Sequence, residues 1–356
     1  MNKIGFIGYG NIGKMIIENI LELNIFDTYE MIISNRTLAK LDNLKESYPK
    51  ITVTNDNKYL AKNSNKIFIF VETPEFKELI NEISPFINNN THIIHVCAGL
   101  SFDNISNVYE GSVSQVIPSI ASTFNEKYKR INKENLNNGS PNNDNFNDEK
   151  LGVSLILHNK ITSSEDKKFV EGVFNEFSYI KLIDNLLGNN NSHNNNYNNN
   201  NYNNNNYNNN NYNNNNNNNN HTNNNNHTNN NINNNYDDNN LEIATILASC
   251  GPAFISLIIN NLADIASLKS RNNIDPDEAK NIIIKTVLGT LIQINNNNNL
   301  NTDEIIRKTA TKKGITKIGL NYLDDNFDEF YGNLFDILLK RFDEVQKDLA
   351  DEYDKS

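Results

Sequence analysis

Tryptophan is absent from this 356-residue chain, and cysteine is almost absent, with only Cys97 and Cys250. Two cysteines in so long a chain exclude a disulfide framework and favour a reducing compartment. Positive charge is also scarce, because 32 Lys and Arg residues stand against 43 Asp and Glu residues, a net charge of −11. Without a cationic excess to replace phosphate counterions, a general nucleic-acid-binding function is excluded.

Long apolar runs are missing as well. No apolar run approaches the roughly 20 residues that a membrane-spanning helix needs, so we expect no membrane partner. The first apolar run begins at Ile4, which leaves no room for a cleavable leader. With the low cysteine count, this predicts a cytoplasmic protein.

Apolar residues make up 37% of the chain, which is low because asparagine dominates three stretches, 189–240, about 134–148 and 295–299. Such tracts offer little apolar area to offset chain entropy, so they are not expected to build a core. A long insertion is tolerated where few contacts cross, as at a domain boundary. We therefore expect an N-terminal domain over 1–184, a linker over 185–240 and a second domain over 241–356.

A glycine-rich turn follows the first apolar run. The pattern Gly-x-Gly-x-x-Gly lies between an expected strand over 4–7 and a helix with apolar residues at helical spacing, and a second expected strand over 30–34 completes a βαβ unit. This order is typical of dinucleotide-binding domains, in which the turn and the helix N-terminus hold a pyrophosphate. The expected cofactor contacts in this turn are Gly8, Tyr9, Gly10, Asn11, Ile12 and Gly13.

The end of the second expected strand indicates which dinucleotide is bound. Sites for NAD usually carry an acidic residue there, whereas this chain has Ser34, Asn35, Arg36 and Thr37. A guanidinium and two hydroxyls suit a 2′-phosphate, so the sequence predicts NADPH rather than NADH. The alternative is that Arg36 only precedes a helix in solvent.

Further expected strands, over 51–54, 66–71, 92–96, 113–117, 152–157 and 179–183, alternate with helices, which predicts a doubly wound parallel sheet. Ligands meet such sheets at the carboxyl ends of the strands, and this edge is expected to present two groups of residues and Ser119. The groups are Val71, Glu72 and Thr73, and Cys97, Ala98 and Gly99. His92 and His95 point to opposite faces of one strand, so no metal site is expected.

The chain from Leu241 onward is expected to be all helical, with helices over 243–267, 276–294 and 302–308, another through Leu323, and a last one over 327–349. The first has apolar residues around most of its circumference. Helices with more than one apolar face commonly bury the excess against a second copy, so we expect a homodimer or a larger homo-oligomer.

The ordered motifs resemble those of the pyrroline-5-carboxylate reductase family. The segments of this chain that correspond to the family's motifs are Ile33–Thr37, Val96–Leu100, Gly251–Phe254, Thr286–Gly289, and Gly314–Thr316 with Gly319–Leu320. The family's Ser-Gly-Ser-Gly-Pro-Ala is Ala248–Ala253 here, and its Pro-Gly-Gly is Lys312–Gly314. These departures are similar to the late-competence (ComER-like) branch of the family.

The resemblance implies a Rossmann domain followed by a helical dimerisation domain, and reduction of 1-pyrroline-5-carboxylate to L-proline by NADPH, the last step of proline biosynthesis. It implies Thr316, Thr245 and Ser249 as catalytic-site hydroxyls. It implies that the small imino-acid substrate contacts Ser119, Cys250, Gly314, Ile315 and Thr316.

Two alternatives stay open at this point. One is a related imine or ketone reductase whose altered loops accept another small carboxylate. The other is a non-catalytic NADP-binding paralogue that has kept Arg36 and the glycine turn.

Overall fold

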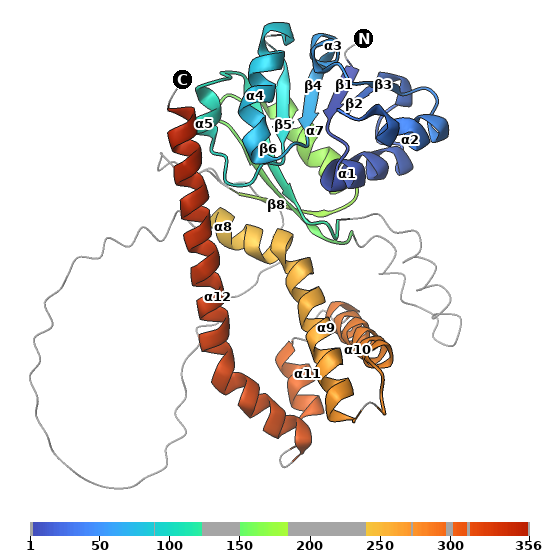
Figure 1. The fold of residues 1–356 in the computed structure, drawn as a ribbon, viewed down its shortest axis with the longest axis vertical. Helices are drawn as coiled ribbons and strands as arrows, with labels where there is room; N and C mark the ends of the chain where they lie inside the picture. The colour runs from blue at the N-terminus through green and yellow to red at the C-terminus, as the bar shows by residue number, and fades with distance from the viewer. Residues whose placement is uncertain are drawn as a thin grey trace, which may run out of the picture. The chain divides into compact units, whose positions relative to one another are not determined.

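The computed structural model describes residues 3–88, 90–122, 150–183, 240–271, 273–296, 302–311 and 314–354 (Figure 1). The asparagine-rich tracts over 189–239 and 134–148, as well as Lys312 and Lys313, lie outside the described residues. All of the described residues belong to one compact unit. The domain boundaries expected from the sequence stay a prediction.

The N-terminal half forms an eight-stranded sheet in the order β3-β2-β1-β4-β5-β6-β7-β8. Its strands are β1 (Lys3–Ile7), β2 (Met31–Ser34), β3 (Thr52–Thr54), β4 (Ser64–Ile69), β5 (His92–His95), β6 (Ser112–Pro118), β7 (Val153–His158) and β8 (Tyr179–Leu182). Strands β1 to β6 are parallel, and β1 lies between β2 and β4, where the strand order reverses. The predicted doubly wound sheet is confirmed, and its switch point lies beside the glycine turn.

One detail of the sheet differs from the prediction. Strand β7 pairs antiparallel with β6, with Val116 opposite Ile156, and β8 is parallel to β7. The alternation of apolar segments along a sequence carries no information on strand direction, so an entirely parallel sheet was the simplest expectation.

Helices cover both faces of the sheet. They are α1 (Asn11–Glu22), α2 (Asp42–Ser47), α3 (Asn57–Asn63), α4 (Thr73–Ile83), α5 (Phe102–Ser106) and α7 (Ser164–Asn175), with short 3₁₀ turns at Thr28–Glu30, Leu38–Leu41 and Ser84–Phe86. One core cluster joins α1 and α7 to the sheet, and a second joins α3, α4 and α5. In the first cluster the rings of Phe6 and Phe68 stack with centroids 5.0 Å apart.

The two strand histidines confirm this two-faced arrangement. His95 packs against Phe76 of α4, with ring centroids 5.1 Å apart, whereas His92 faces Asp166 of α7. Both rings are fully buried.

The C-terminal half begins with a continuous helix made of α8 (Asn240–Thr245), a π-helical turn (Ile246–Cys250) and α9 (Gly251–Lys269). Pro252 explains the wide turn, because proline has no N–H for a bond to the preceding turn and its ring crowds the carbonyl of Ala248. The expectation that no segment has the length and apolarity of a membrane span is wrong, since this helix, Asn240–Lys269, meets both criteria. Isolated polar residues such as Ser256 and Asn260 interrupt the apolar run without making the helix polar overall.

The remaining helices are α10 (Pro276–Asn296), α11 (Thr302–Thr309) and α12 (Ile315–Tyr353). Helix α12 is one helix of 39 residues, where the sequence predicted two (Figure 1). The polar run Asp324–Asn326 suggested a break, but it contains neither glycine nor proline. Instead, the Asn326 side chain donates to the Tyr322 carbonyl oxygen at 2.6 Å, which a helix interior tolerates.

The last turns of α12 pack against the second core cluster of the sheet. Leu349 and Tyr353 are buried in this cluster together with Cys97 and Leu100. The Lys77 ammonium donates to the Glu352 carbonyl oxygen at 2.7 Å and lies 5.1 Å from the centre of the Tyr353 ring. The C-terminal end of α12 is therefore fixed close to the carboxyl end of strand β5.

Candidate cofactor and substrate site

The glycine turn has the geometry that a pyrophosphate requires. Gly8 has φ of +100°, and a Cβ added there would lie 2.6 Å from the Phe70 carbonyl oxygen. A Cβ at Gly13 would meet the Gly8 carbonyl and the Phe70 side chain, so this position needs glycine for close helix–strand packing. A Cβ at Gly10, in contrast, would meet nothing within 4 Å. The first and third glycines thus meet packing demands, and the second leaves an open approach to the backbone.

Helix α1 presents an uncapped N-terminus at this opening. Gly10 is its N-cap residue, no side chain caps the helix, and the first turn has no acidic residue. Its first N–H groups have no acceptor within the helix, and the helix dipole favours an anion there. Asn11 and Ile12 lie in this first turn, so the backbone fits a phosphate group.

The three candidate residues at the end of β2 differ in their availability. Ser34 is buried and its hydroxyl donates to Asn57 Oδ1 at 2.7 Å. Asn35 Oδ1 accepts the Tyr9 N–H at 3.0 Å, and its amide donates to the Thr37 carbonyl at 2.8 Å. The Arg36 side chain is 91% exposed. Arg36 is therefore the member of this set that is open to an incoming anion, and Asn35 braces the glycine turn.

Tyr9 contributes its backbone to the turn while its ring points into the core. The ring is 8% exposed, and the hydroxyl donates to Glu18 Oε1 at 3.0 Å. Burial, reinforced by Glu18, raises the pKa of Tyr9 above its ordinary value. Tyr9 therefore stays neutral and anchors the turn to α1.

The β4 and β5 ends are tied to each other. Thr73 donates to the Ala98 carbonyl oxygen at 3.3 Å, and the Cys97 thiol lies 3.5 Å from the Val71 carbonyl oxygen. Burial raises the pKa of the Cys97 thiol to about 12, which excludes a thiolate nucleophile. Gly99 has φ of +78°, and a Cβ there would lie 3.1 Å from Val345 of α12.

The β6 end presents other residues than the sequence predicted. Ser119 is 2% exposed, and its oxygen accepts the Ala121 N–H at 3.3 Å. Ile120 is the exposed neighbour, at 53%. The amide of Asn19 on α1 donates to the Ser122 carbonyl at 3.2 Å, so this loop is tied to the cofactor helix. The contact of Ser119 with substrate stays a prediction, and its hydroxyl is turned away from solvent.

The π-helical turn brings a second group of candidates to the sheet, because it contacts β6 and β7. Thr245, just before the turn, is buried and donates to the Leu241 carbonyl at 2.7 Å within the helix. Ser249 and Cys250 are half-buried, and burial raises the pKa of the Cys250 thiol. Ser249 is thus the hydroxyl of this group that is partly accessible to solvent.

Gly314, Ile315 and Thr316 lie at the start of α12. Gly314 is the N-cap residue, no side chain caps the helix, and Thr316 is exposed. Leu349, near the other end of this helix, packs in the cluster that contains Cys97. About 50 Å of helix separates Thr316 from Leu349 at 1.5 Å per residue. One chain therefore does not bring Thr316 to its own cofactor turn.

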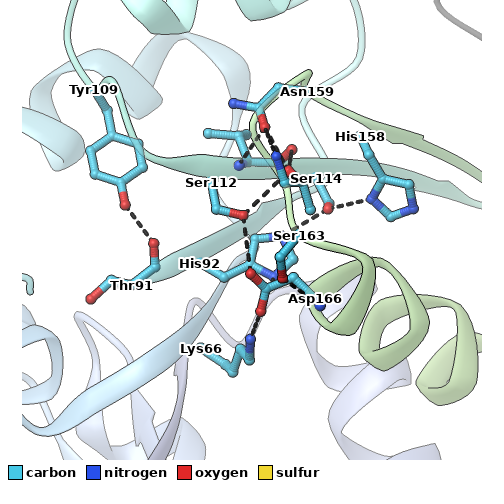
Figure 2. A network of polar contacts seen from close by, with 12 residues as sticks. Lys66, Thr91, His92, Tyr109, Ser112, Ser114, His158, Asn159, Ser163 and Asp166 are labelled. Atoms are coloured by element: carbon cyan, nitrogen blue, oxygen red, sulfur yellow. Dashed lines mark hydrogen bonds and ion pairs between the residues drawn. The ribbon is translucent and has the colours of Figure 1, made fainter. Parts of the chain in front are cut away.

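A buried polar network lies at the opposite, amino edge of the sheet (Figure 2). Asp166 pairs with Lys66 and lies 3.7 Å from His92 Nδ1. The Ser114 hydroxyl bridges His92 Nε2 at 2.8 Å and His158 Nδ1 at 2.6 Å. Burial, then Lys66 and His158, lowers the pKa of His92 to about 3, and burial, then Lys167, lowers that of His158 to about 4.

Both histidines are thus neutral and join α7 and β7 to the parallel strands. The described residues contain no group of three or more His, Cys, Asp or Glu side chains that could hold a metal ion.

Sequence reasoning missed the side chains that hold the site in place. Besides Asn19 and Asn57, Gln115 on β6 donates to the Cys97 carbonyl at 2.6 Å. A signal existed for two of them, since Gln115 interrupts an apolar strand and Asn19 lies on the apolar face of a helix. A polar residue at a buried position indicates a specific hydrogen-bond partner.

Two family models match separate parts of the chain. Residues 238–344 match the model described as pyrroline-5-carboxylate reductase dimerisation. Residues 3–99 match the model described as NADP oxidoreductase, coenzyme F420-dependent.

Among curated proteins, the pyrroline-5-carboxylate reductase of Methanobrevibacter smithii is 32% identical over 322 residues, covering 90% of this chain and 97% of the relative. The ComE operon protein 4 of Bacillus subtilis strain 168 is 32% identical over 118 residues, which cover 33% of this chain and 43% of that protein. Among solved structures, a pyrroline carboxylate reductase of Plasmodium falciparum with NADP bound has a TM-score of 0.63 at 17% identity, covering 97% of this chain and 98% of the other.

Proposed function

This chain belongs to the pyrroline-5-carboxylate reductase family, and we propose that it reduces 1-pyrroline-5-carboxylate to L-proline with NADPH, the last step of proline biosynthesis. The observation that carries the cofactor half of this proposal is the opening at Gly10, where a Cβ would meet nothing within 4 Å. The uncapped start of α1 and the exposed Arg36 lie at the same switch point of the sheet.

The residues present fit a dinucleotide. The backbone from Gly8 to Gly13 holds the pyrophosphate, and Arg36 receives the 2′-phosphate. Thr73 and the turn from Cys97 to Gly99 line the nicotinamide end at the edges of β4 and β5. The bound nicotinamide supplies the hydride, so the protein's own task is to position the imine carbon and its carboxylate.

The substrate end of the site comes from the helical half. The uncapped start of α12, with Gly314 and Thr316, suits a carboxylate through backbone N–H groups and one hydroxyl. Ser249, Cys250 and Thr245 line the π-helical turn beside β6 and β7. Because about 50 Å of helix separates Thr316 from the cofactor end of its own chain, Thr316 serves the site of a second copy.

Exposed apolar side chains support this homo-oligomer. Helices α9, α10 and α12 expose apolar residues in the single chain, among them Leu257, Ile258, Leu262, Ile265, Ile282, Leu291, Ile318, Tyr322 and Phe330. Each Leu or Ile side chain fully removed from water contributes about 1.5–3 kcal/mol. A second copy that covers these helices also explains why Asn240–Lys269 is apolar enough for a membrane yet only 17% buried in its most apolar stretch.

A second candidate function is a related reductase with a different small carboxylic imine or ketone as substrate. The β6 loop favours it, because this loop exposes Ile120 and buries Ser119. An apolar side chain at that position selects for substrate shape rather than for a hydrogen-bonding group. A non-catalytic NADP-binding paralogue is the third candidate.

The test mixes the purified full chain with NADPH and 1-pyrroline-5-carboxylate. The loss of nicotinamide absorbance measures the rate of the reaction. We expect turnover that Thr316→Ala reduces and Thr316→Ser largely keeps, because serine retains the hydroxyl. Turnover on another cyclic imine or ketone but not on this substrate would favour the second candidate. NADPH binding without turnover on any of them would favour the third.

We also propose that the protein works in the cytoplasm and that residues 185–240 are a linker. Both described cysteines are free, as expected in a reducing compartment. Fluorescence microscopy of a tagged full chain tests the location.

A further inference from the structure

Arg36 is the cation among Ser34, Asn35 and Arg36 at the β2 end, and it is already paired with an anion of the same chain. Arg36 Nη1 lies 3.5 Å from Glu75 Oε1, with the two side chains 91% and 51% exposed. Glu75 lies in the first turn of α4, on the other side of the switch point from β2. The two charges therefore come from separate elements that meet at the cofactor edge.

The neighbours of Arg36 do not offer a replacement for it. The Ser34 hydroxyl is engaged with Asn57, and the Asn35 amide is engaged with Tyr9 and Thr37. Of the three residues at this strand end, Arg36 alone presents an exposed cationic group to an incoming anion, and Glu75 is paired with that group. Whatever occupies its guanidinium competes directly with that anion.

We propose that Glu75 is an internal counter-ion that weakens the preference of the site for NADPH over NADH. The inference rests on the proposed function, in which Arg36 receives the 2′-phosphate. Arginine binds a phosphate through paired N–H groups, so a 2′-phosphate competes with the Glu75 carboxylate for this guanidinium. The carboxylate also repels the phosphate, which carries charge of the same sign. NADH has no 2′-phosphate, so it meets neither the competition nor the repulsion.

The position of Glu75 keeps its charge in place. A carboxylate in the first turn of a helix is favoured by the helix dipole. Because both side chains are largely exposed, water and salt weaken the repulsion, which limits the change in affinity to about threefold to tenfold at low ionic strength.

The experiment compares Glu75→Gln with Glu78→Gln by titrating each full-length variant with NADPH and with NADH and following nicotinamide fluorescence. Glu78 lies on the same helix and is exposed, so its substitution removes the same charge without touching Arg36. We expect Glu75→Gln to bind NADPH about threefold to tenfold more tightly and NADH unchanged, with the gain shrinking at high salt. Glu78→Gln should leave the ratio of the two dissociation constants unchanged.

Equal changes for NADPH and NADH in Glu75→Gln, or no change in either, would overturn the inference. An Arg36→Gln variant separates this failure from failure of the cofactor assignment. Suppose that Arg36→Gln weakens the binding of NADPH far more than that of NADH, while Glu75→Gln has no selective effect. The assignment of Arg36 to the 2′-phosphate is then supported, and the role of Glu75 as a counter-ion is refuted. If Arg36→Gln weakens the binding of both cofactors equally, both the assignment of Arg36 to the 2′-phosphate and the inference about Glu75 are refuted.

Discussion

His95 allows a quantitative test of the environment at the β5 end. Its ring is fully buried against Phe76, and its Nδ1 accepts the Cys97 N–H at 3.3 Å. The proton of the neutral ring is therefore on Nε2, and a second proton on Nδ1 would face a donor. Burial lowers the pKa of His95 from 6.5 to about 3.

The lowered pKa gives the pH dependence its sign. Because the folded chain keeps His95 neutral while the unfolded chain protonates it below pH 6.5, stability is full above 6.5 and is lost as the pH falls towards 3. Each pH unit in this window costs about 1.4 kcal/mol, so His95 removes about 3 kcal/mol by about pH 4.5. That loss is a large share of the 5–15 kcal/mol that typically stabilises a folded protein.

The perturbation is His95→Asn, whose Oδ1 preserves an acceptor for the Cys97 N–H. At about pH 7.5 the variant should be less stable than the unchanged chain by about 1–3 kcal/mol, because the ring packing against Phe76 is lost. This difference should fall by about 3 kcal/mol by about pH 4.5, since the variant has no proton to take up at this position. His92 and His158 are present in both proteins, so their contributions cancel.

The assay is urea unfolding followed by far-ultraviolet circular dichroism at constant ionic strength over this pH range. A stability difference that stays constant with pH would refute the reasoning. A ring C–H resonance of His95 that titrates above about pH 5 in the folded protein would do the same.

Three further outcomes are expected. Gly10→Ala should keep the melting temperature but weaken NADPH binding, whereas Gly8→Ala should lower the melting temperature and weaken NADPH binding, because Gly8 has φ of +100° and the Phe70 carbonyl oxygen blocks a Cβ there. Thermal unfolding with and without NADPH measures both effects, and equal behaviour of the two variants would contradict the prediction. Gly8→Ala and Thr316→Ala subunits should each have low activity alone. When the two are mixed at random, activity should rise towards about a quarter of that of the unchanged chain if each site uses Thr316 of the second copy, and should not rise if each chain builds its own site. Replacing residues 189–238 by a short Gly-Ser linker should leave activity and melting temperature nearly unchanged, and loss of either would show that the tract is more than a linker.

The glycine turn and the strand ends were predictable because their chemistry is local. The spacing of Gly8, Gly10 and Gly13 fixes a turn between a strand and a helix, and the carboxyl ends of parallel strands meet at one edge. Nothing distant is needed to infer an anion site there. The helical character of the second half follows from local periodicity in the same way.

The use of individual side chains was not predictable, because it depends on partners far along the chain. Ser34 and Arg36 are two residues apart, yet Asn57 engages the first and leaves the second exposed. Asn19 meets the carbonyl of Ser122, 103 residues away. Strand direction at β7 is equally non-local, since the pairing with β6 decides it.

Helix α12 combines a local pattern, its helical periodicity, with contacts to residues far along the chain. Its length is the reason that we propose a site shared between two copies of the chain. Gly99 has no side chain, so Val345 approaches the turn beside the proposed nicotinamide site, and Leu349 and Tyr353 hold that end of the helix. The same uninterrupted helix carries Thr316 about 50 Å away. A break at Asp324–Asn326, as the sequence suggested, would let the start of α12 fold back towards its own cofactor turn. Continuity removes that freedom, so in the proposed homo-oligomer the helix that anchors one cofactor site would deliver its substrate residues to the site of a second copy.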